Sequence, residues 1–493
     1  MPDFDSTLIE SDDGPLLGRT PPMLSYFCVY NPSLCHSEEN TKDQILYYTA
    51  KKVVPADVKM KQVGLAQALV NVTSAFSVSR STENVHSQRN RMVFLQPEPG
   101  FWIHMCVELG ILRRQIKDPK GKEKLVTEYL DTELNDRALS SILQIGYEQF
   151  KLLNGTMTSI LYGDDDSNSK PNRQQTRTLM HAIEEFFSSW IWHWDFDRLD
   201  SMVFGAVFNG IPSQPIVRSN YLDIHHLDLS VQKQFNSLIS HMLVLDHEGS
   251  LIYRSLSLQS LDVRSLRKYI LKRVEAYKIQ QDNISAKQKE NESSTKKEKG
   301  TTTTLKALTK SLSQAHIFNY FSKTSSSTTT DTSLPVADTT TTVTSDALLS
   351  PPTDIPTAPS SPVTESFDQN THHCQGVFLT GMVDSIVHDL NGDDINVTKE
   401  DIVRVYLNSY PIVEEDDTTK PDPDILSEYI LIIYKDQSNL VWSFLLPSYE
   451  QDVDDLVRDI DFYHSLERFM LEQGMSQIVS AIWKNIEEGE KRT

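Results

Sequence analysis

Residues 60–76 read MKQVGLAQALVNVTSAF, and this stretch decides how the N-terminal part of the chain folds. On a wheel at about 100° per residue, its apolar side chains cover an arc of roughly 220°, and its polar stripe consists of Gln67, Asn71 and Ser74. A helix that packs on one sheet needs an apolar face of only about 100°. The excess predicts either a helix sunk in the core of its own domain or a helix with a second face covered by a partner chain.

The segments around this helix predict a compact α+β domain over residues 23–156. Short apolar runs with strand character end at turn signals such as Asn31-Pro32. A second amphipathic helix is predicted over 136–153, where apolar residues recur at three- and four-residue steps. The predicted element order is therefore β-β-α-β-β-β-α. The predicted strands are 24–30, 44–49, 90–96, 101–112 and 124–130.

The remaining chain divides by composition. Residues 1–22 are polar and acidic, which predicts disorder. Residues 282–371 form a predicted linker, because Ser and Thr make up 22 of the 43 residues between 324 and 366 and such a segment cannot bury a core. Two further α+β units are predicted at 177–281 and 374–493. Their hairpins look alike, which suggests a repeated domain type.

The net charge and the lack of known catalytic motifs narrow the classes of function that the chain can have. The net charge is −21, with 47 Lys and Arg against 68 Asp and Glu, so a nucleic-acid-binding chain is disfavoured. The chain carries no phosphate loop and no nucleophile-elbow or zinc-protease motif. His225-His226 and His372-His373-Cys374 are weak metal sites, because adjacent strand residues point to opposite faces. We expect no catalytic residues, cofactor or metal, and an interaction protein rather than an enzyme.

The cysteine pattern and the termini point to a reducing compartment. The four cysteines form no C-x-x-C pair, so no disulfide framework or zinc site is indicated. The acidic start lacks the apolar region of a signal peptide, and no apolar run approaches the ~20 residues of a membrane span. We expect a soluble, cytoplasmic protein.

Two stretches are candidates for contact with an anionic membrane. The first is a basic hairpin in an acidic chain, which could equally be a solvated turn. The second is the amphipathic segment 305–321 within the linker, which could also have no partner. The candidate membrane residues are Arg113, Arg114, Lys117, Lys120, Lys122 and Lys124 in the hairpin, and Leu305, Leu308, Leu312, Phe318 and Phe321 in the linker.

Several stretches of the first domain carry a family resemblance. They are SYFCVYNPSL (25–34), the Val63-Gly64-Leu65 helix start, HSQRNR (86–91) followed by Phe94, Pro97-Glu98 before Phe101-Trp102, SILQIGYEQFKLLNGT (141–156), and GVFLTG (376–381) beyond the linker. In these residues the chain resembles the calcium–caffeine–zinc sensitivity protein family of vacuolar fusion proteins. Members of this family pair with the monensin-sensitivity longin protein.

The resemblance implies an α+β chain of three longin-like domains, each an antiparallel sheet flanked by helices. It further implies a heterodimer that acts as guanine-nucleotide exchange factor for the late-endosomal or vacuolar Rab GTPase. Such a complex works without covalent chemistry, peripherally on late-endosome and vacuole membranes, in endosome maturation, vacuole fusion and autophagy. The first longin domains of the two subunits would together form the Rab platform.

Site residues follow from the resemblance by position. The Rab-platform candidates are Tyr26, Tyr30, Asn31, Pro32, His86, Gln88, Asn90 and Arg91. For the last four of these, a purely structural role in bracing the start of a strand is the alternative. The partner-interface candidates are Val63, Ala66, Leu69, Val70 and Phe76, which could instead be core residues. The alternative function is a longin adaptor or effector that binds a GTPase without exchange activity.

Overall fold

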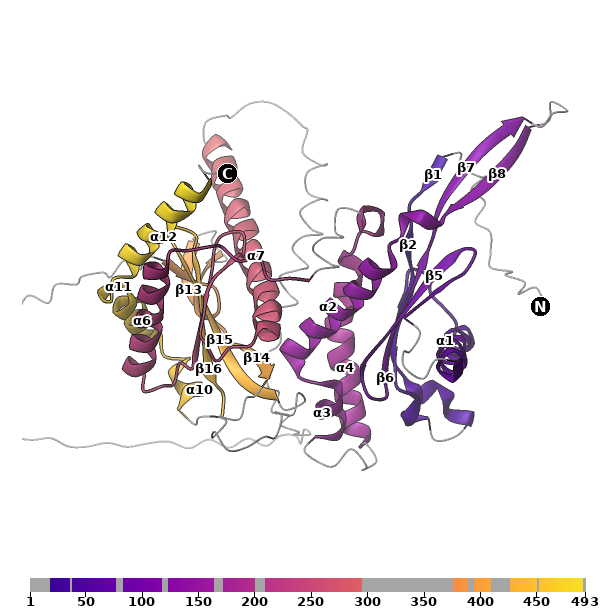
Figure 1. Cartoon of the computed structure of the whole chain (residues 1–493), viewed down its shortest axis with the longest axis horizontal. Coiled ribbons are helices and arrows are strands. Elements are labelled where there is room, and N and C mark those ends of the chain that lie inside the picture. The colour runs from indigo at the N-terminus through magenta and orange to yellow at the C-terminus, as the bar shows by residue number, and fades with distance from the viewer. Residues whose placement is uncertain are drawn as a thin grey trace, which may run out of the picture.

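The computed structural model of the 493-residue chain describes residues 18–35, 38–76, 83–117, 123–163, 172–199, 209–294, 376–388, 394–408, 426–449 and 452–490. The two largest sheets, each flanked by helices, lie side by side (Figure 1). The predicted α+β class with antiparallel sheets is confirmed. None of the helices in the described ranges combines the length and the apolarity needed to cross a membrane.

The first sheet has five antiparallel strands in the order β3-β2-β6-β5-β4. Side chains of its strand β2 alternate between two cores: Phe27 and Val29 face one, and Tyr26, Cys28 and Tyr30 face the other. Both faces of the sheet are therefore covered. The strands are β2 (Met23–Tyr30), β3 (Ile45–Ala50), β4 (Asn84–His86), β5 (Asn90–Glu98) and β6 (Phe101–Glu108).

Helices cover the two faces of this sheet unequally. Among the described residues, one α-helix, α1 (Ala56–Phe76), lies on one face. The other face is covered by α2 (Asp136–Asn154), α3 (Met157–Tyr162) and α4 (Arg173–Trp190). The carboxylate of Glu98 at the end of β5 fixes α3, because it accepts hydrogen bonds from the backbone N–H groups of Met157 and Thr158, each at 2.7 Å.

The position of α4 corrects the predicted domain boundaries. We predicted that the first domain ends at residue 156 and that the second begins at 177. Leu179, Ile183 and Phe187 of α4 instead lie in the core beneath the first sheet. Gly146 on α2 makes this packing possible, since a Cβ there would lie 2.6 Å from the Trp190 ring. The sequence does not show which sheet the apolar face of this helix covers.

A three-stranded sheet extends beyond the first domain. It has the order β1-β7-β8 and consists of β1 (Gly18–Thr20), β7 (Gly110–Lys117) and β8 (Glu123–Leu130), with the β7–β8 hairpin projecting outward (Figure 1). Residues 18–20 therefore form a strand, although disorder was predicted to residue 22. The predicted strand 101–112 is in fact two strands, β6 and β7, which belong to different sheets.

The second sheet joins strands that we assigned to two separate domains. β9 (His241–Leu245), from the predicted second unit, pairs antiparallel with β16 (Val441–Pro447), from the predicted third unit. The resulting order is β10-β9-β16-β15-β11, and β14 also pairs with β15. The two segments therefore build one sheet rather than two. The other strands are β10 (Leu251–Arg254), β11 (Gly376–Phe378), β14 (Val403–Asn408) and β15 (Leu426–Asp436), and a two-stranded ribbon is made of β12 (Gly381–His388) and β13 (Asp394–Asp401).

Helices again cover both faces of the second sheet. One face carries α6 (Arg218–Gln234), α11 (Ile460–Glu472) and α12 (Met475–Glu490), and the short α10 (Val453–Leu456) belongs to the same core. The opposite face carries α7 (Ser260–Ser294). Because α7 continues to residue 294, the first part of the predicted linker 282–371 is helical. The rest of that linker lies outside the described residues.

Helix α2 links the two halves of the chain (Figure 1). Its Leu152 lies in the core beneath α7, while Leu139 and Phe150 lie in the core of the first sheet. At the contact, the Gln149 side chain donates a 2.9 Å hydrogen bond to the Ser265 carbonyl, and Glu148 is paired with Arg264 and Lys268 of α7.

Candidate functional site

Helix α1 has one buried and one exposed apolar face. Val63, Ala66 and Val70 are buried against the sheet, and Leu69 is half-buried beside them. Leu65, Val72 and Phe76 are 49%, 56% and 87% exposed. Of the predicted partner-interface residues, only Phe76 is freely accessible, and Val63, Ala66 and Val70 belong to the core.

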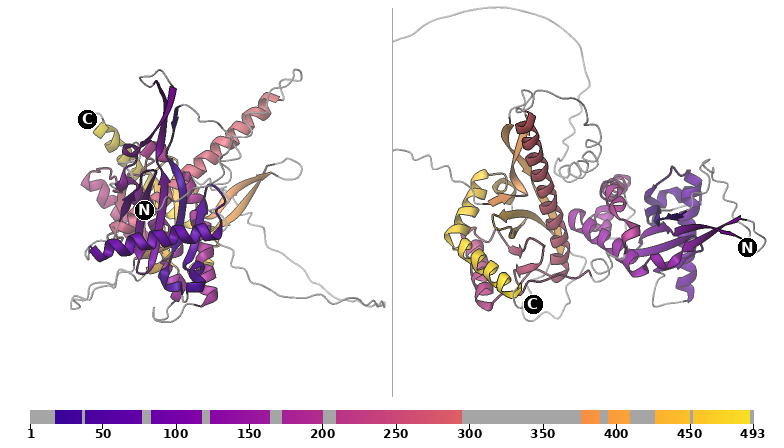
Figure 2. Two further views of the ribbon diagram at one scale, coloured as in Figure 1. Left: turned by 90° about the vertical axis from the view of Figure 1, so that its right-hand side faces the viewer. Right: turned by 90° about the horizontal axis from the view of Figure 1, so that it is seen from above.

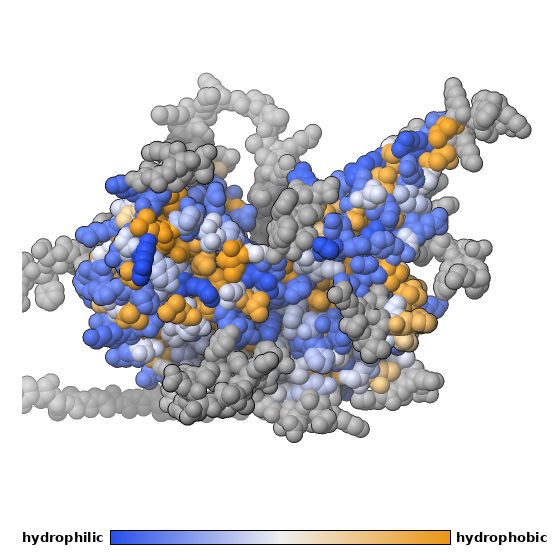
Figure 3. All heavy atoms as spheres, in the orientation of Figure 1, coloured by the Kyte–Doolittle hydropathy of each residue, from blue (hydrophilic) through white to orange (hydrophobic). Residues whose placement is uncertain are grey.

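The exposed apolar residues of α1 form a continuous stripe. Leu65, Ala68, Val72, Ala75 and Phe76 are exposed and fall within about 100° of one another on the helix. We call these five residues the α1 stripe. The left-hand view of Figure 2 shows α1 lying across the face of the first domain that is turned to the viewer. Apolar atoms gather over the same helix at the right-hand side of Figure 3.

Polar contacts fix the helix in this orientation. The Tyr48 hydroxyl of β3 donates a 2.6 Å hydrogen bond to the side-chain oxygen of Gln62, and the Gln67 amide donates a 2.6 Å bond to Gln44. Both contacts lie on flanks of α1, between its buried and its exposed face. Rotating the stripe toward the sheet would break both bonds, so the stripe is held at the surface.

A buried polar cluster lies beneath α1. The His104 ring is fully buried, lies 2.9 Å through Nε2 from the Tyr26 hydroxyl and 3.2 Å through Nδ1 from the Val93 carbonyl, and stacks on Phe94. Nδ1 therefore donates to the carbonyl and Nε2 accepts from the tyrosine. Burial lowers the pKa of His104 to about 4 and raises that of Tyr26 far above its ordinary value.

The platform candidates around β2 are mostly inaccessible. Tyr26 and Tyr30 are buried beneath α1, and Asn31 is buried and caps the following turn by accepting from the Ser33 N–H at 3.0 Å. Pro32 is the exposed member of this group. These three side chains are buried in this chain, so Pro32 is the member of the group that is open to contact.

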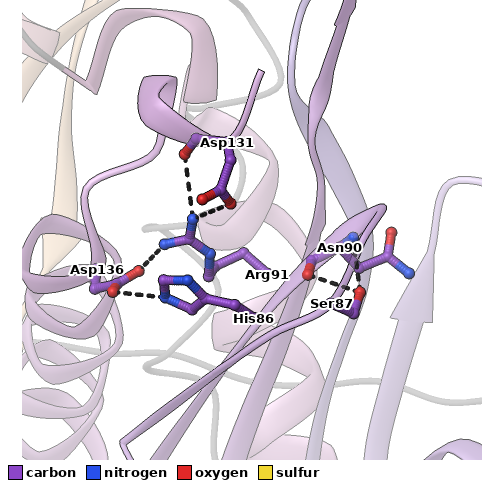
Figure 4. A network of polar contacts seen from close by, with 6 residues as sticks. All are labelled: His86, Ser87, Asn90, Arg91, Asp131 and Asp136. Atoms are coloured by element: carbon purple, nitrogen blue, oxygen red, sulfur yellow. Dashed lines mark hydrogen bonds and ion pairs between the residues drawn. The ribbon is translucent and has the colours of Figure 1, made fainter. Parts of the chain in front are cut away.

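The His86–Arg91 segment is tied to the start of α2 (Figure 4). Arg91, whose side chain is 3% exposed, forms ion pairs with Asp131, at 2.5 Å, and with Asp136. His86 lies 2.8 Å from the same Asp136 carboxylate. Both residues thus brace the β4–β5 hairpin against α2, which was the structural alternative considered for them.

The turn between β4 and β5 remains accessible. Asn90 and Ser87 close it, since the Asn90 N–H donates to the Ser87 hydroxyl and this hydroxyl donates to the Asn90 carbonyl, both at 2.9 Å (Figure 4). Gln88 at the tip is exposed, as are the candidates Pro32 and His86.

The basic hairpin is described except at its tip, residues 118–122. Arg113 donates to the Thr20 hydroxyl at 2.9 Å, and Arg114 pairs with Glu128 at 3.0 Å. Sequence reasoning missed the exposed apolar residues Ile116, Leu125 and Val126 on the same strands. Leu125 and Val126 are neighbours, so an alternating strand pattern does not place both at the surface. Lys120, Lys122 and the linker candidates Leu305, Leu308, Leu312, Phe318 and Phe321 lie outside the described residues, as do the side chains of Lys117 and Lys124.

Within the described ranges no three His, Cys, Asp or Glu side chains are grouped as a metal site would require. His225 instead makes a 2.9 Å hydrogen bond to the Tyr253 hydroxyl, and His226 is exposed. His372, His373 and Cys374 fall outside these ranges.

Comparison with known proteins assigns the first domain. Residues 24–155 match the family model described as "First Longin domain of INTU, CCZ1 and HPS4". This segment is a first longin domain. The match ends before α4, although α4 completes the core of the longin domain.

Known relatives extend the likeness beyond the longin domain. The chain is 30% identical over 250 residues to the protein of Xenopus tropicalis named "Vacuolar fusion protein CCZ1 homolog". The aligned region covers 51% of this chain and 48% of the relative. It is 26% identical over 256 residues to the Dictyostelium discoideum protein of the same name, over 51% of this chain and 52% of that one. The chain thus spans about half the length of the curated relatives it matches, and the family resemblance seen in the sequence is confirmed.

Proposed function

We propose that this chain is one longin subunit of a heterodimeric guanine-nucleotide exchange factor for a late-endosomal or vacuolar Rab GTPase. The match to a first longin domain and the relatives named as vacuolar fusion proteins support a role in vacuole fusion. The partner is the monensin-sensitivity longin protein, and the complex acts in endosome maturation and autophagy.

The α1 stripe is the observation that carries the proposal. Leu65, Val72 and Phe76 would together gain about 4 kcal/mol on transfer from water into an interface. A contiguous exposed apolar patch of this kind is typical of a protein contact site. A partner longin domain covering the stripe would place its own sheet beside β2–β6 and create a platform wider than either subunit alone offers.

Exchange then requires only differential binding. The complex binds nucleotide-free GTPase more tightly than nucleotide-bound GTPase, so by linkage it weakens nucleotide binding by the same factor. A thousandfold loss of nucleotide affinity corresponds to about 4 kcal/mol. Pro32 and Gln88 are the candidate contacts, while Arg91 and Asn31 hold the surrounding backbone in place. No covalent step is involved.

Membrane association completes the proposal. The complex binds peripherally to late-endosomal and vacuolar membranes, and the basic hairpin and the segment 305–321 are its candidate contacts with anionic lipid. Each basic residue near such a surface contributes about 1 kcal/mol.

The interface is tested by charging the stripe. In Leu65→Asp/Val72→Asp, two carboxylates replace exposed apolar groups, so the variant should fold but not copurify with the partner subunit. The matched control is Leu222→Asp/Leu229→Asp on α6, which has the same spacing and similar exposure, 51% and 50%. Copurification of the stripe variant at the level of the control would rule out this interface.

Exchange itself is measured by release of a fluorescent GDP analogue from the Rab. We expect fast release with both subunits, little with this chain alone, and little with the stripe variant mixed with the partner. A single chain with full activity would refute the shared platform. If the chain binds GTP-loaded Rab better than nucleotide-free Rab, the adaptor or effector function is the correct one.

A further inference from the structure

The N-terminal end of α1 carries a group of lysines in an otherwise acidic chain. Lys51 and Lys52 are exposed in the loop between β3 and α1. Lys61 is 72% exposed and lies 3.8 Å from Asp57, and Lys59 lies 4.9 Å above the Tyr48 ring. We call Lys51, Lys52, Lys59 and Lys61 the lysine corner. Asp57 offsets one of its four charges, in a protein whose net charge is −21.

The lysine corner is continuous with the α1 stripe. Lys61 precedes Leu65 by four residues, so both lie on the same face of the helix. Only three residues lie between Lys51 and Pro55, which comes directly before the helix. The amide groups at the start of α1 add further positive potential at this end. Lys59 lies over the Tyr48 ring on the sheet side of the helix, and Lys61 is paired with Asp57 on the stripe face. The net positive charge at this end of the stripe therefore comes from Lys51 and Lys52, while Phe76 at the other end is uncharged.

This polarity argues against a second copy of the chain as the occupant of the stripe. If two copies paired with their α1 helices parallel, two lysine corners would face each other and repel. If they paired antiparallel, each corner would face Ser74, Ala75 and Phe76 of the other copy, none of which carries a carboxylate. Like-charge contacts of this kind exclude wrong partners.

We propose that the partner subunit covering the α1 stripe presents an acidic patch to the lysine corner, and that this corner selects the partner and speeds its association. The inference rests on the proposed heterodimer and names the chemistry of its interface. Charges at the rim of an interface act mainly on the association rate and on its salt dependence, while the apolar centre sets the dissociation rate.

The test is charge reversal in Lys51→Glu/Lys52→Glu. Association of the full chain with the purified partner subunit is measured by surface plasmon resonance at low and at physiological salt. The control is Lys233→Glu/Lys484→Glu, which reverses two exposed lysines on α6 and α12. At low salt we expect association of the corner variant to slow about tenfold, with a nearly unchanged dissociation rate, while the control behaves as wild type. Added salt should slow the wild type and leave the variant almost unaffected.

The possible failures are distinguishable. If the stripe variant does not bind the partner but the corner variant associates as fast as the control, the lysine corner has no steering role and the heterodimer stands. If the stripe variant binds normally, the proposed interface itself is wrong. Self-association of the wild type as tight as its binding to the partner would overturn the argument against a second copy. If the corner variant binds the partner normally but no longer binds phosphatidylserine vesicles, the lysines face a membrane instead.

Discussion

His104 makes the stability of the longin domain depend on pH. Its pKa is about 4 in the folded protein, because the ring is fully buried, against an ordinary value of about 6.5 in the unfolded chain. Because the folded-state pKa is lower than the unfolded-state pKa, the unfolding free energy is unaffected by His104 above about pH 6.5. It decreases as the pH falls from about 6.5 toward 4. In this pH range the His104 ring is protonated in the unfolded chain and neutral in the folded chain.

The magnitude follows from the two pKa values. Between pH 8 and pH 5 the longin domain should lose about 2 kcal/mol of unfolding free energy from this residue alone, and about 3 kcal/mol once the pH is below 4. The variant His104→Gln has no titrating ring, so its stability should be lower at pH 8 but should fall less steeply toward pH 5. The difference between the two pH profiles isolates the contribution of His104.

The pH dependence of stability around His104 can be measured in the full chain by hydrogen exchange of peptides from β2 and β6, corrected for intrinsic exchange rates. A local readout is needed because Asp262 acts in the opposite direction in the second half: burial raises its pKa to about 6, so its contribution is lost as the pH rises from about 4 to 6. His181→Gln on α4 is the control, since that side chain is largely exposed. Parallel profiles for wild type and His104→Gln would refute the reasoning.

Three further predictions concern stability and packing. Arg91→Ala leaves Asp131, before α2, and Asp136, at its start, without their buried partner and should cost about 1–3 kcal/mol of unfolding free energy in thermal denaturation. Arg114→Ala at an exposed pair should cost about 0.5 kcal/mol or less, and equal losses would contradict the bracing role. Gly146→Leu should displace Trp190 and release α4, seen as faster proteolysis within α4, and unchanged cleavage would show that α4 does not depend on this contact. Glu148→Ala should speed hydrogen exchange at the start of α7 and leave β2 unaffected; equal effects at both places would mean that the loss is global.

Local pattern predicted the first domain well. The apolar run of β2, the apolar arc of α1 and the three- and four-residue steps of α2 predicted these elements. The predicted order lacked β1 and β4 and merged β6 with β7. The assignment of individual residues to the faces of α1 failed for Val63, Ala66 and Val70, because a helical wheel does not show which side meets the sheet.

Nonlocal pairing could not be predicted from the sequence. The pairing of β9 with β16 joins strands about 200 residues apart, and no sequence pattern in either strand identifies the strand with which it pairs. The same limit applies to α4, which we assigned to the second domain although its apolar residues lie in the first core. Likewise, His86 and Arg91 were recognised by position, but their carboxylate partners became visible only once α2 was placed beside β5.

The sharing of α2 decides where this chain can be divided. A fragment that ends at residue 155, where the family match ends, would lack α4. Phe27 and Phe150, which pack against Phe187 of α4, would then be exposed to water. A fragment beginning at 209 would lose Leu152 from beneath α7. Expression trials built on the family boundary should therefore yield aggregates, and a soluble N-terminal piece should need to extend at least through Leu199, the last buried residue of that core.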